Sequence, residues 1–119
     1  MIEIPVSTGE VIDKITILQI KQERIFDHTK QKNVTKELNQ LLSRLDVSKI
    51  EHFDELKRVN EQLWEVEDAI RVCEKKQQFG DEFVRLARSV YVLNDQRAEL
   101  KRQINLETDS ELIEEKSYD

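Results

Sequence analysis

The chain has 119 residues, 37% of them charged, with only two glycines and one proline. This length suits one domain with its own core, and so little glycine and proline argues against a turn-rich β fold and favours long helices. No apolar run approaches the roughly 20 residues that a membrane span needs, and the N-terminus lacks the regions of a secretory signal. The only cysteine, Cys73, fits a reducing compartment, so we expect a cytoplasmic protein with no membrane partner.

The net charge of −6 is concentrated at one end of the chain. Residues 1–106 hold 18 Lys and Arg against 19 Asp and Glu, whereas residues 107–119 hold one Lys against six Asp and Glu. The body is therefore near neutral and the tail is acidic. Neither part offers the clustered positive charge that a nucleic-acid backbone attracts, so we expect no nucleic-acid partner.

A short extended arm over residues 1–6 precedes the first predicted helix. Ser7 is a good N-cap, and Glu10 three residues later completes a capping box. Gly9 within the first turn is unfavourable for a helix, although a first turn tolerates it better than an interior does. We expect this helix to begin after Ser7 and to fade over residues 27–32.

The first helix carries apolar residues on two sides. Ile17 and Ile20 lie nearly opposite a broad apolar face, whereas a surface helix needs only one stripe. Water must then be excluded on both sides, either by the chain's own bundle or by another copy. We predict a homodimer that buries Ile17 and Ile20 through this helix. The broad face comprises Val11, Ile12, Ile15, Leu18, Ile25 and Phe26.

Two further helices are predicted before residue 80. Asn33 can cap a second helix, whose apolar stripe covers residues 34–45. Ser48 and Glu51 form another capping box, which opens a third helix that reaches about residue 76. The apolar residues of this third helix alternate at spacings of three and four, a seam typical of antiparallel bundles and coiled coils.

Gly80 is expected to stop the third helix, and Asp81 to cap a fourth. The short break between them predicts an antiparallel hairpin. A further short helix is compatible with the sequence after Ser110, and Tyr118 stands near the end of the tail.

The predicted fold is therefore all-α and bundle-like. It has three to four helices, built on a long antiparallel hairpin of the third and fourth. We expect one helical domain over residues 1–119, with an arm at 1–6 and an acidic tail at 107–119.

Polar residues interrupt the apolar seam of the fourth helix. The long stems of Arg97 and Lys101 either lie on the core with their charged ends in water, or bring the charges to buried carboxylates or an anionic ligand. Asp13 and Glu67 are candidate carboxylates. The second interpretation predicts a polar layer, which often serves only to fix helix register. Its members would be Asp13, Asn60, Glu67, Arg71, Asn94, Arg97 and Lys101.

Trp64, the only tryptophan, lies at the edge of the third-helix seam. It either packs between helices or anchors an interface or a ligand. No recognisable nucleophile motif or glycine-rich phosphate loop is present, so no catalytic residue is identified and no cofactor is predicted.

Carboxylates on the third and fourth helices are spaced like the Mg²⁺ ligands of all-helical nucleotide pyrophosphohydrolases of the MazG and dimeric dUTPase type. Both sets face away from their seams, so we interpret them as solvated surfaces. His28 and His52 are far apart and make no zinc pattern with one cysteine. No metal site is predicted. The carboxylates are Glu61, Glu65, Asp68, Asp95 and Glu99.

Four stretches carry a likeness that covers most of the chain: I-E-I-P-V-S-T-G-E-V-I-D-K-I-T-I-L, L-W-E-V-E-D-A-I-R, F-V-R-L-A-R-S-V-Y to N-D-Q-R-A-E-L-K-R-Q-I-N, and E-E-K-S-Y. Through them the chain resembles a family of small single-domain helical proteins of unknown function. The resemblance implies a complete protein but no reaction, cofactor or partner. It points to polar residues as weak site candidates: Asp13, Lys14, Trp64, Glu67, Asp68, Arg71, Asn94, Asp95, Arg97, Lys101 and Lys116.

The segment I-D-K-I-T-I-L-Q-I-K-Q-E-R-I also resembles the first helix of the all-helical chorismate mutases, which bind a dianionic substrate with Arg and Lys inside a helical dimer. By this resemblance the charges would come from Arg24, Arg71, Arg97 and Lys101. The arginine expected before the I-D pair is absent, with residues 7–11 in its place.

Two classes of function follow from these patterns. The regular seams and the acidic tail favour a helical interaction or assembly protein without catalytic activity. The alternative is a small all-helical enzyme that binds an anionic metabolite or nucleotide through Arg97 and Lys101. Such an enzyme would be chorismate mutase-like or a Mg²⁺-dependent pyrophosphohydrolase.

Overall fold

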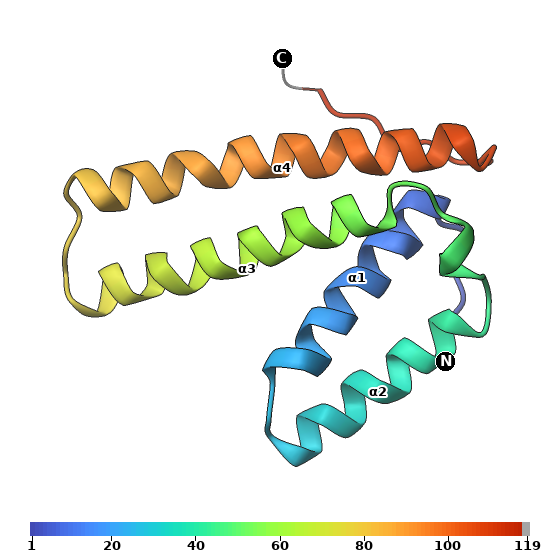
Figure 1. The fold of residues 1–119 in the computed structure, drawn as a ribbon, viewed down its shortest axis with the longest axis horizontal. Helices are drawn as coiled ribbons and strands as arrows, with labels where there is room; N and C mark the ends of the chain where they lie inside the picture. The colour runs from blue at the N-terminus through green and yellow to red at the C-terminus, as the bar shows by residue number, and fades with distance from the viewer. Residues whose placement is uncertain (118–119) are drawn as a thin grey trace.

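The computed structural model describes residues 1–117. These residues form four helices and one 3₁₀ turn and contain no strand, which confirms the all-α prediction. The longest two helices make the predicted antiparallel hairpin, and a shorter hairpin leaves one end of it at an angle (Figure 1). The elements are α1 (Thr8–Arg24), α2 (His28–Leu42), η1 (Val47–Lys49), α3 (Phe53–Lys75) and α4 (Asp81–Glu107).

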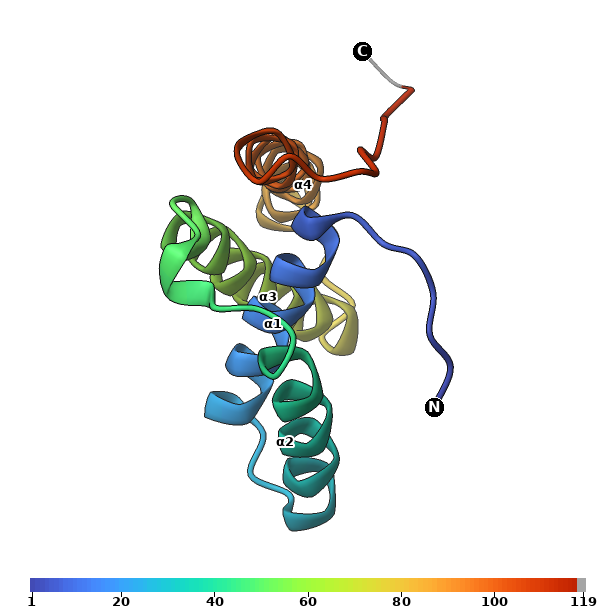
Figure 2. The ribbon, with the colours of Figure 1, turned by 90° about the vertical axis from the view of Figure 1, so that its right-hand side faces the viewer.

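The core lies where the two hairpins meet. α1 packs against each of the other three helices, and in Figure 2 it lies beside α3, between α4 and α2. Ile12, Ile15, Leu56 and Ile104 have no exposed surface, and burying such a side chain contributes about 1.5–3 kcal/mol. No helix within residues 1–117 combines the length and the apolar character that crossing a bilayer requires.

The two apolar sides of α1 are both covered by the chain itself. Ile20 is 1% exposed in the single chain, and Ile17 is half-buried. The predicted two-sided burial is thus confirmed, but it arises because α1 has three helical neighbours. The pattern therefore gives no reason to place a dimer interface at Ile17 and Ile20.

The predicted N-cap of α1, Ser7, is correct, but the Glu10 carboxylate binds Lys101 instead of closing the capping box. The cap predicted for α2 is wrong. The Ser7 hydroxyl accepts a hydrogen bond from the backbone N–H of Glu10 at 3.2 Å. α2 begins at His28 with Asp27 as its cap, whose carboxylate accepts from the Lys30 N–H at 2.9 Å. Asn33 instead lies inside α2, because a favourable cap already stands six residues earlier.

The predicted start of the third helix is also wrong. Asp46 accepts hydrogen bonds from the backbone and the hydroxyl of Ser48 and caps the short η1. α3 then begins only at Phe53. Ser48 therefore lies inside a 3₁₀ turn capped by Asp46 and does not cap an α-helix.

The break between α3 and α4 depends on Gln77 rather than Gly80. Gln77 has φ 55°, in the left-handed region, whereas Gly80 has φ −83°. The N–H of Gln78 bonds back to the carbonyl of Cys73 at 2.9 Å, which closes the helix end in the manner usually built with glycine. Asp81 is the first residue of α4 rather than its cap.

The segments that precede α1 and follow α4 within residues 1–117 carry no regular structure. Residues 1–6 are exposed and have no helix or strand, and residues 111–117 contain no helix, so the short helix after Ser110 is not formed. Tyr118, the last residue of the E-E-K-S-Y stretch, lies outside the described residues.

The half of the hairpin far from α1 and α2 is thinly packed. Figure 1 shows that α3 and α4 continue past the shorter hairpin, where each has only the other as a neighbouring helix. Of residues 61–95, only Cys73 and Leu86 are buried, each 7% exposed. We call residues 61–95 the distal hairpin, and the remainder of the four helices the base.

Candidate functional site

Asp13 is the centre of a buried polar layer in the base. Its carboxylate, 1% exposed, accepts two hydrogen bonds from Arg97: Nε to Oδ1 at 2.8 Å and Nη2 to Oδ2 at 2.5 Å. The amide of Asn60 donates to Asp13 Oδ1 at 2.9 Å and to the hydroxyl of Thr16 at 2.8 Å. The layer thus joins α1, α3 and α4 at one level.

The pairing explains how a carboxylate survives burial at this position. An unpaired charge in the core would cost several kcal/mol, and the two-point contact with a guanidinium is the strongest side-chain partner available. The hydrogen bonds that Arg97 donates to Asp13 raise the pKa of Arg97 above its ordinary value, with a further contribution from the negative charge of Asp13. Arg97 thus does not simply extend its charged end into water: the prediction that it meets a buried carboxylate is confirmed.

Lys101 makes a second contact between α4 and α1, one turn further along. Its side chain is 10% exposed, and Nζ lies 2.7 Å from Glu10 and 3.4 Å from Glu114 of the tail. Burial lowers the pKa of Lys101, but the hydrogen bond to Glu10 and the charges of Asp13, Glu10 and Glu114 outweigh it, so the pKa is raised overall. Lys101 therefore remains charged and ties the start of α1 to both α4 and the tail.

The N-terminus of α1 docks directly onto the end of α4. The N–H of Gly9 donates to the side-chain carbonyl of Asn105 at 2.6 Å, and the N–H of Thr8 donates to Ser110 Oγ at 3.0 Å. Groups that a helix start leaves without partners are satisfied in this way. A Cβ at Gly9 would lie 2.5 Å from the carbonyl oxygen of Lys101, so only glycine permits this approach.

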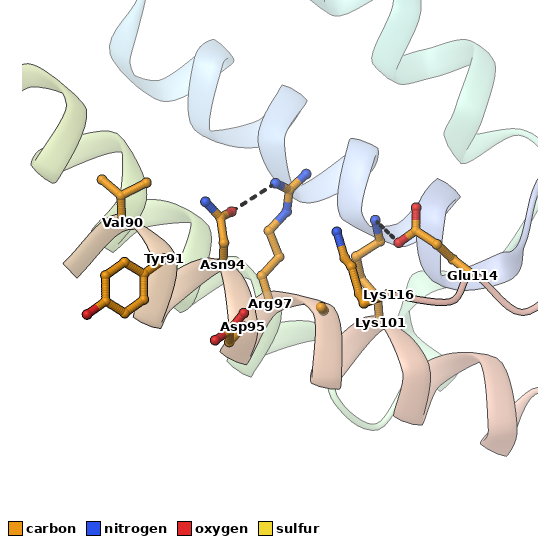
Figure 3. Close-up of a pocket in the computed structure, with 9 residues that line it drawn as sticks. Val90, Tyr91, Asn94, Asp95, Arg97, Lys101, Glu114 and Lys116 are labelled. Carbon is orange, nitrogen blue, oxygen red and sulfur yellow. Dashed lines mark hydrogen bonds and ion pairs between the residues drawn. The ribbon is translucent and has the colours of Figure 1, made fainter. Parts of the chain in front are cut away.

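A groove of about 610 Å³ runs along α4 beside these contacts. In Figure 3, Arg97 and Lys101 rise from α4 toward α1, whereas Tyr91 and Asp95 turn away from it. Asn94 accepts a hydrogen bond from Arg97 Nη1 at 3.4 Å, and the tail contributes Glu114 and Lys116 to the wall. Arg97 and Lys101 are thus each paired with a carboxylate at the groove.

A family described as a family of unknown function, DUF6165, matches residues 2–119. The chain belongs to this family. The predicted resemblance to a small helical family of unknown function is confirmed, and the family supplies no reaction. Comparison with curated proteins and with solved structures gives no match.

The structure brings together some of the candidate residues and separates others. Asp13, Asn94 and Arg97 meet as described, with Lys101 beside them. Glu67 and Arg71 do not join the layer: both are exposed and pair with each other at 3.7 Å on α3. They lie in the distal hairpin, beyond the contact with α1, so no buried carboxylate or cation is within their reach. Trp64, which also lies on α3, is half-buried.

The carboxylates that resemble a Mg²⁺ set lie on surfaces, as predicted. Glu65, Asp68, Asp95 and Glu99 are exposed and Glu61 is half-buried. Arg24, the fourth cation of the chorismate mutase resemblance, lies 3.5 Å from Glu65. The four cations of that resemblance therefore each have a carboxylate partner, in three different parts of the molecule.

One cluster with metal-ligand spacing was missed from the sequence. Ligand atoms of Glu51, His52 and Glu107 lie within 4.8 Å of one another. The cluster forms because the end of α4 lies beside the start of α3, which sequence spacing does not reveal. A hydrogen bond to Glu55 at 3.2 Å raises the pKa of His52, helped by the nearby charges of Glu107 and Glu51 and opposed by burial. Protonated His52 is therefore an ionic link between the two helix ends.

α4 also has an outer face, directed away from α1 and α3. Its residues fall within a sector of about 120° at 3.6 residues per turn. Val84, Tyr91 and Val92 on this face are 49%, 54% and 46% exposed. A shallow hollow of about 400 Å³ lies between them. The outer face comprises Asp81, Val84, Arg85, Arg88, Tyr91, Val92, Asp95, Glu99, Arg102, Gln103 and Leu106.

Proposed function

We propose that this protein is a helical assembly protein that associates with a second copy of itself through the outer face of α4. The observation that carries the proposal is the thin packing of the distal hairpin. Residues 61–95 bury only two side chains, while Val84, Tyr91 and Val92 are about half exposed on the same helix.

A helical hairpin of this kind gains little stability from its own seam. Most helical stability in proteins comes from packing an apolar face against a neighbour rather than from helix propensity. If the hairpin of a second copy packed against the first, the four helices would bury the outer face of each α4, as in a four-helix bundle. A second copy is the partner whose surface matches the first by charge.

The enzyme alternative receives no comparable support. Arg97 and Lys101, which an anionic substrate would need, already bind Asp13, Glu10 and Glu114. The groove beside them therefore offers little net positive charge. In this position the polar layer is explained by its role in fixing α1 against α4.

The proposal is tested by the mass of the protein in solution. We expect light scattering after size exclusion to give about twice the chain mass of 14.2 kDa at micromolar concentration. Val92→Glu replaces an apolar contact of the interface with a charged side chain that must be desolvated, and should yield monomers. Val72→Glu is the matched control, because Val72 is 48% exposed on α3, outside this face, and should leave the dimer intact.

Helix content by circular dichroism should be equal in both variants, which separates loss of assembly from loss of fold. A wild-type mass of one chain, or a dimer unaffected by Val92→Glu, would overturn the proposal.

A further inference from the structure

We infer that the two copies meet with α4 antiparallel to α4, about a two-fold axis that passes between Tyr91 and Val92. The inference rests on the proposed self-association and adds the orientation and register of the partner. It follows from the order of charges along the outer face of α4 and from the position of the base.

The charges of the outer face are self-complementary about this axis. In an antiparallel pair with two-fold symmetry, residues equally distant from the axis on the two copies face each other. Arg88 and Asp95 are equally distant from the midpoint between Tyr91 and Val92, and so are Asp81 and Arg102. Arg85 lies opposite Ala98, one residue from Glu99, so these two long side chains are close to opposition without being centred on it. Each contact occurs twice, so Asp81, Arg88, Asp95 and Arg102 each meet a charge of opposite sign.

Neighbouring registers lack this match. An axis at Arg88 would place the two Arg88 side chains together and Asp81 opposite Asp95. An axis at Asp95 would place the two Asp95 side chains together and Arg88 opposite Arg102. A parallel pair would set every charge against its own copy. Since like charges in contact are unfavourable, the charge order selects one register among these arrangements.

The apolar residues lie where this register needs them. Tyr91 and Val92 lie at the axis, so Tyr91 of one copy faces Val92 of the other and the reverse. Their burial would supply the apolar contact. The hollow beside them is lined by Arg85 and Arg88, and the partner's Asp95 would enter it. Exposed ion pairs contribute little energy each, so burial provides the affinity while the charges fix the orientation.

The antiparallel orientation also keeps the two bases apart. α1 and α2 lie at one end of α4 (Figure 1), so an antiparallel partner carries its base at the opposite end. Arg102 binds Glu115 of the tail at 2.8 Å but remains 43% exposed. It can therefore also reach an acidic side chain of the partner.

Charge reversal and its repair test the register. We expect Arg88→Asp to face two Asp95 carboxylates across the dimer and Asp95→Arg to face two Arg88 side chains. Each single variant should raise the dimer dissociation constant about tenfold or more, equivalent to about 1.4 kcal/mol. The double variant Arg88→Asp/Asp95→Arg should restore it to within about threefold of the wild type. Arg71→Asp, on an exposed α3 position, is the matched control and should have little effect.

The outcomes separate register from assembly. If Val92→Glu gives monomers but the double reversal restores nothing, the register is wrong and self-association through this face stands. If the wild type is a monomer, both proposals fail. Sedimentation equilibrium over a range of concentrations gives the dissociation constants, and circular dichroism checks that each variant is folded.

Discussion

The base and the distal hairpin are built from the same two long helices, yet they differ in how the helices are held. In the base, α3 and α4 have α1 as a common neighbour and share a fully enclosed core and a paired polar layer. In the distal hairpin α3 and α4 pack against each other, and α1 reaches them only through the pairs of Arg24 with Glu61 and Glu65. The helices run through both regions without a break. The number of helices packed against α3 and α4, rather than their helix propensity, therefore sets the local stability.

Removing the central cation should have the largest effect on the base. Arg97→Ala leaves Asp13 buried with only Asn60 as a side-chain donor. Breaking a buried pair costs about 3–5 kcal/mol, and we expect about 3 kcal/mol because water can enter beside Arg97, whose side chain is 30% exposed. Urea unfolding followed by circular dichroism measures the loss of free energy of unfolding.

A surface arginine outside the proposed interface provides the control for this prediction. Arg71→Ala removes an ion pair with Glu67, whose side chain is 53% exposed, and should cost less than about 1 kcal/mol. Equal losses for Arg97→Ala and Arg71→Ala would mean that the buried layer does not hold the base together.

The next largest effect is expected where α1 approaches α4. Gly9→Ala would place a Cβ 2.5 Å from the carbonyl oxygen of Lys101. This is a backbone atom, so no side-chain rotation can relieve the clash. Overpacking of this kind costs about 1–3 kcal/mol, so we expect a loss of about 2 kcal/mol together with displacement of the Asn105 contact. Thermal unfolding compares the variant with Gly80→Ser.

Gly80 is the matched glycine of the distal hairpin. A Cβ there meets nothing within 4 Å, and serine is a good residue at a helix cap. Gly80→Ser should therefore be neutral or slightly stabilising. A melting temperature for Gly9→Ala equal to that of Gly80→Ser would contradict the close docking of α1.

The fold was predictable because it depends on regular spacing. Apolar residues at intervals of three and four predicted the α3/α4 hairpin, and the Ser7 capping box predicted the start of α1. Helix starts at Asn33 and Ser48 were wrong, because several residues in each loop can cap and only tertiary packing selects one. The two apolar sides of α1 correctly indicated burial from two directions, but a sequence cannot show whether the cover is the same chain or another copy.

The polar layer was predictable only in part. Arg97 interrupts an apolar seam and Asp13 interrupts an apolar helix face, so a pair between them was a reasonable hypothesis. Glu67 and Arg71 have the same pattern, but they lie where α1 no longer reaches. Gly9 carried a usable signal: a glycine that weakens a first turn requires a compensating reason, and close approach to Lys101 is that reason.

The smallest predicted effect separates the two regions most directly. Gln77 at the end of α3 and Asp109 at the end of α4 both adopt left-handed backbone, with φ 55° and 51°. Glycine accepts this conformation without the steric cost of a side chain, so Gln77→Gly should stabilise by about 0.5–1 kcal/mol. Asp109→Gly should gain less, because aspartate tolerates the region better than glutamine.

If the distal hairpin opens on its own, the two variants should act in different places. Amide hydrogen exchange reports local opening as well as global unfolding, so Gln77→Gly should slow exchange within residues 61–95 and leave α1 nearly unchanged. Asp109→Gly should leave the amides of residues 61–95 unchanged, because its gain lies at the base. Uniform slowing over the whole chain by Gln77→Gly would show that base and hairpin unfold as one unit. The thin packing of the distal hairpin would then not create a separately opening region, and a partner would be less necessary to hold it.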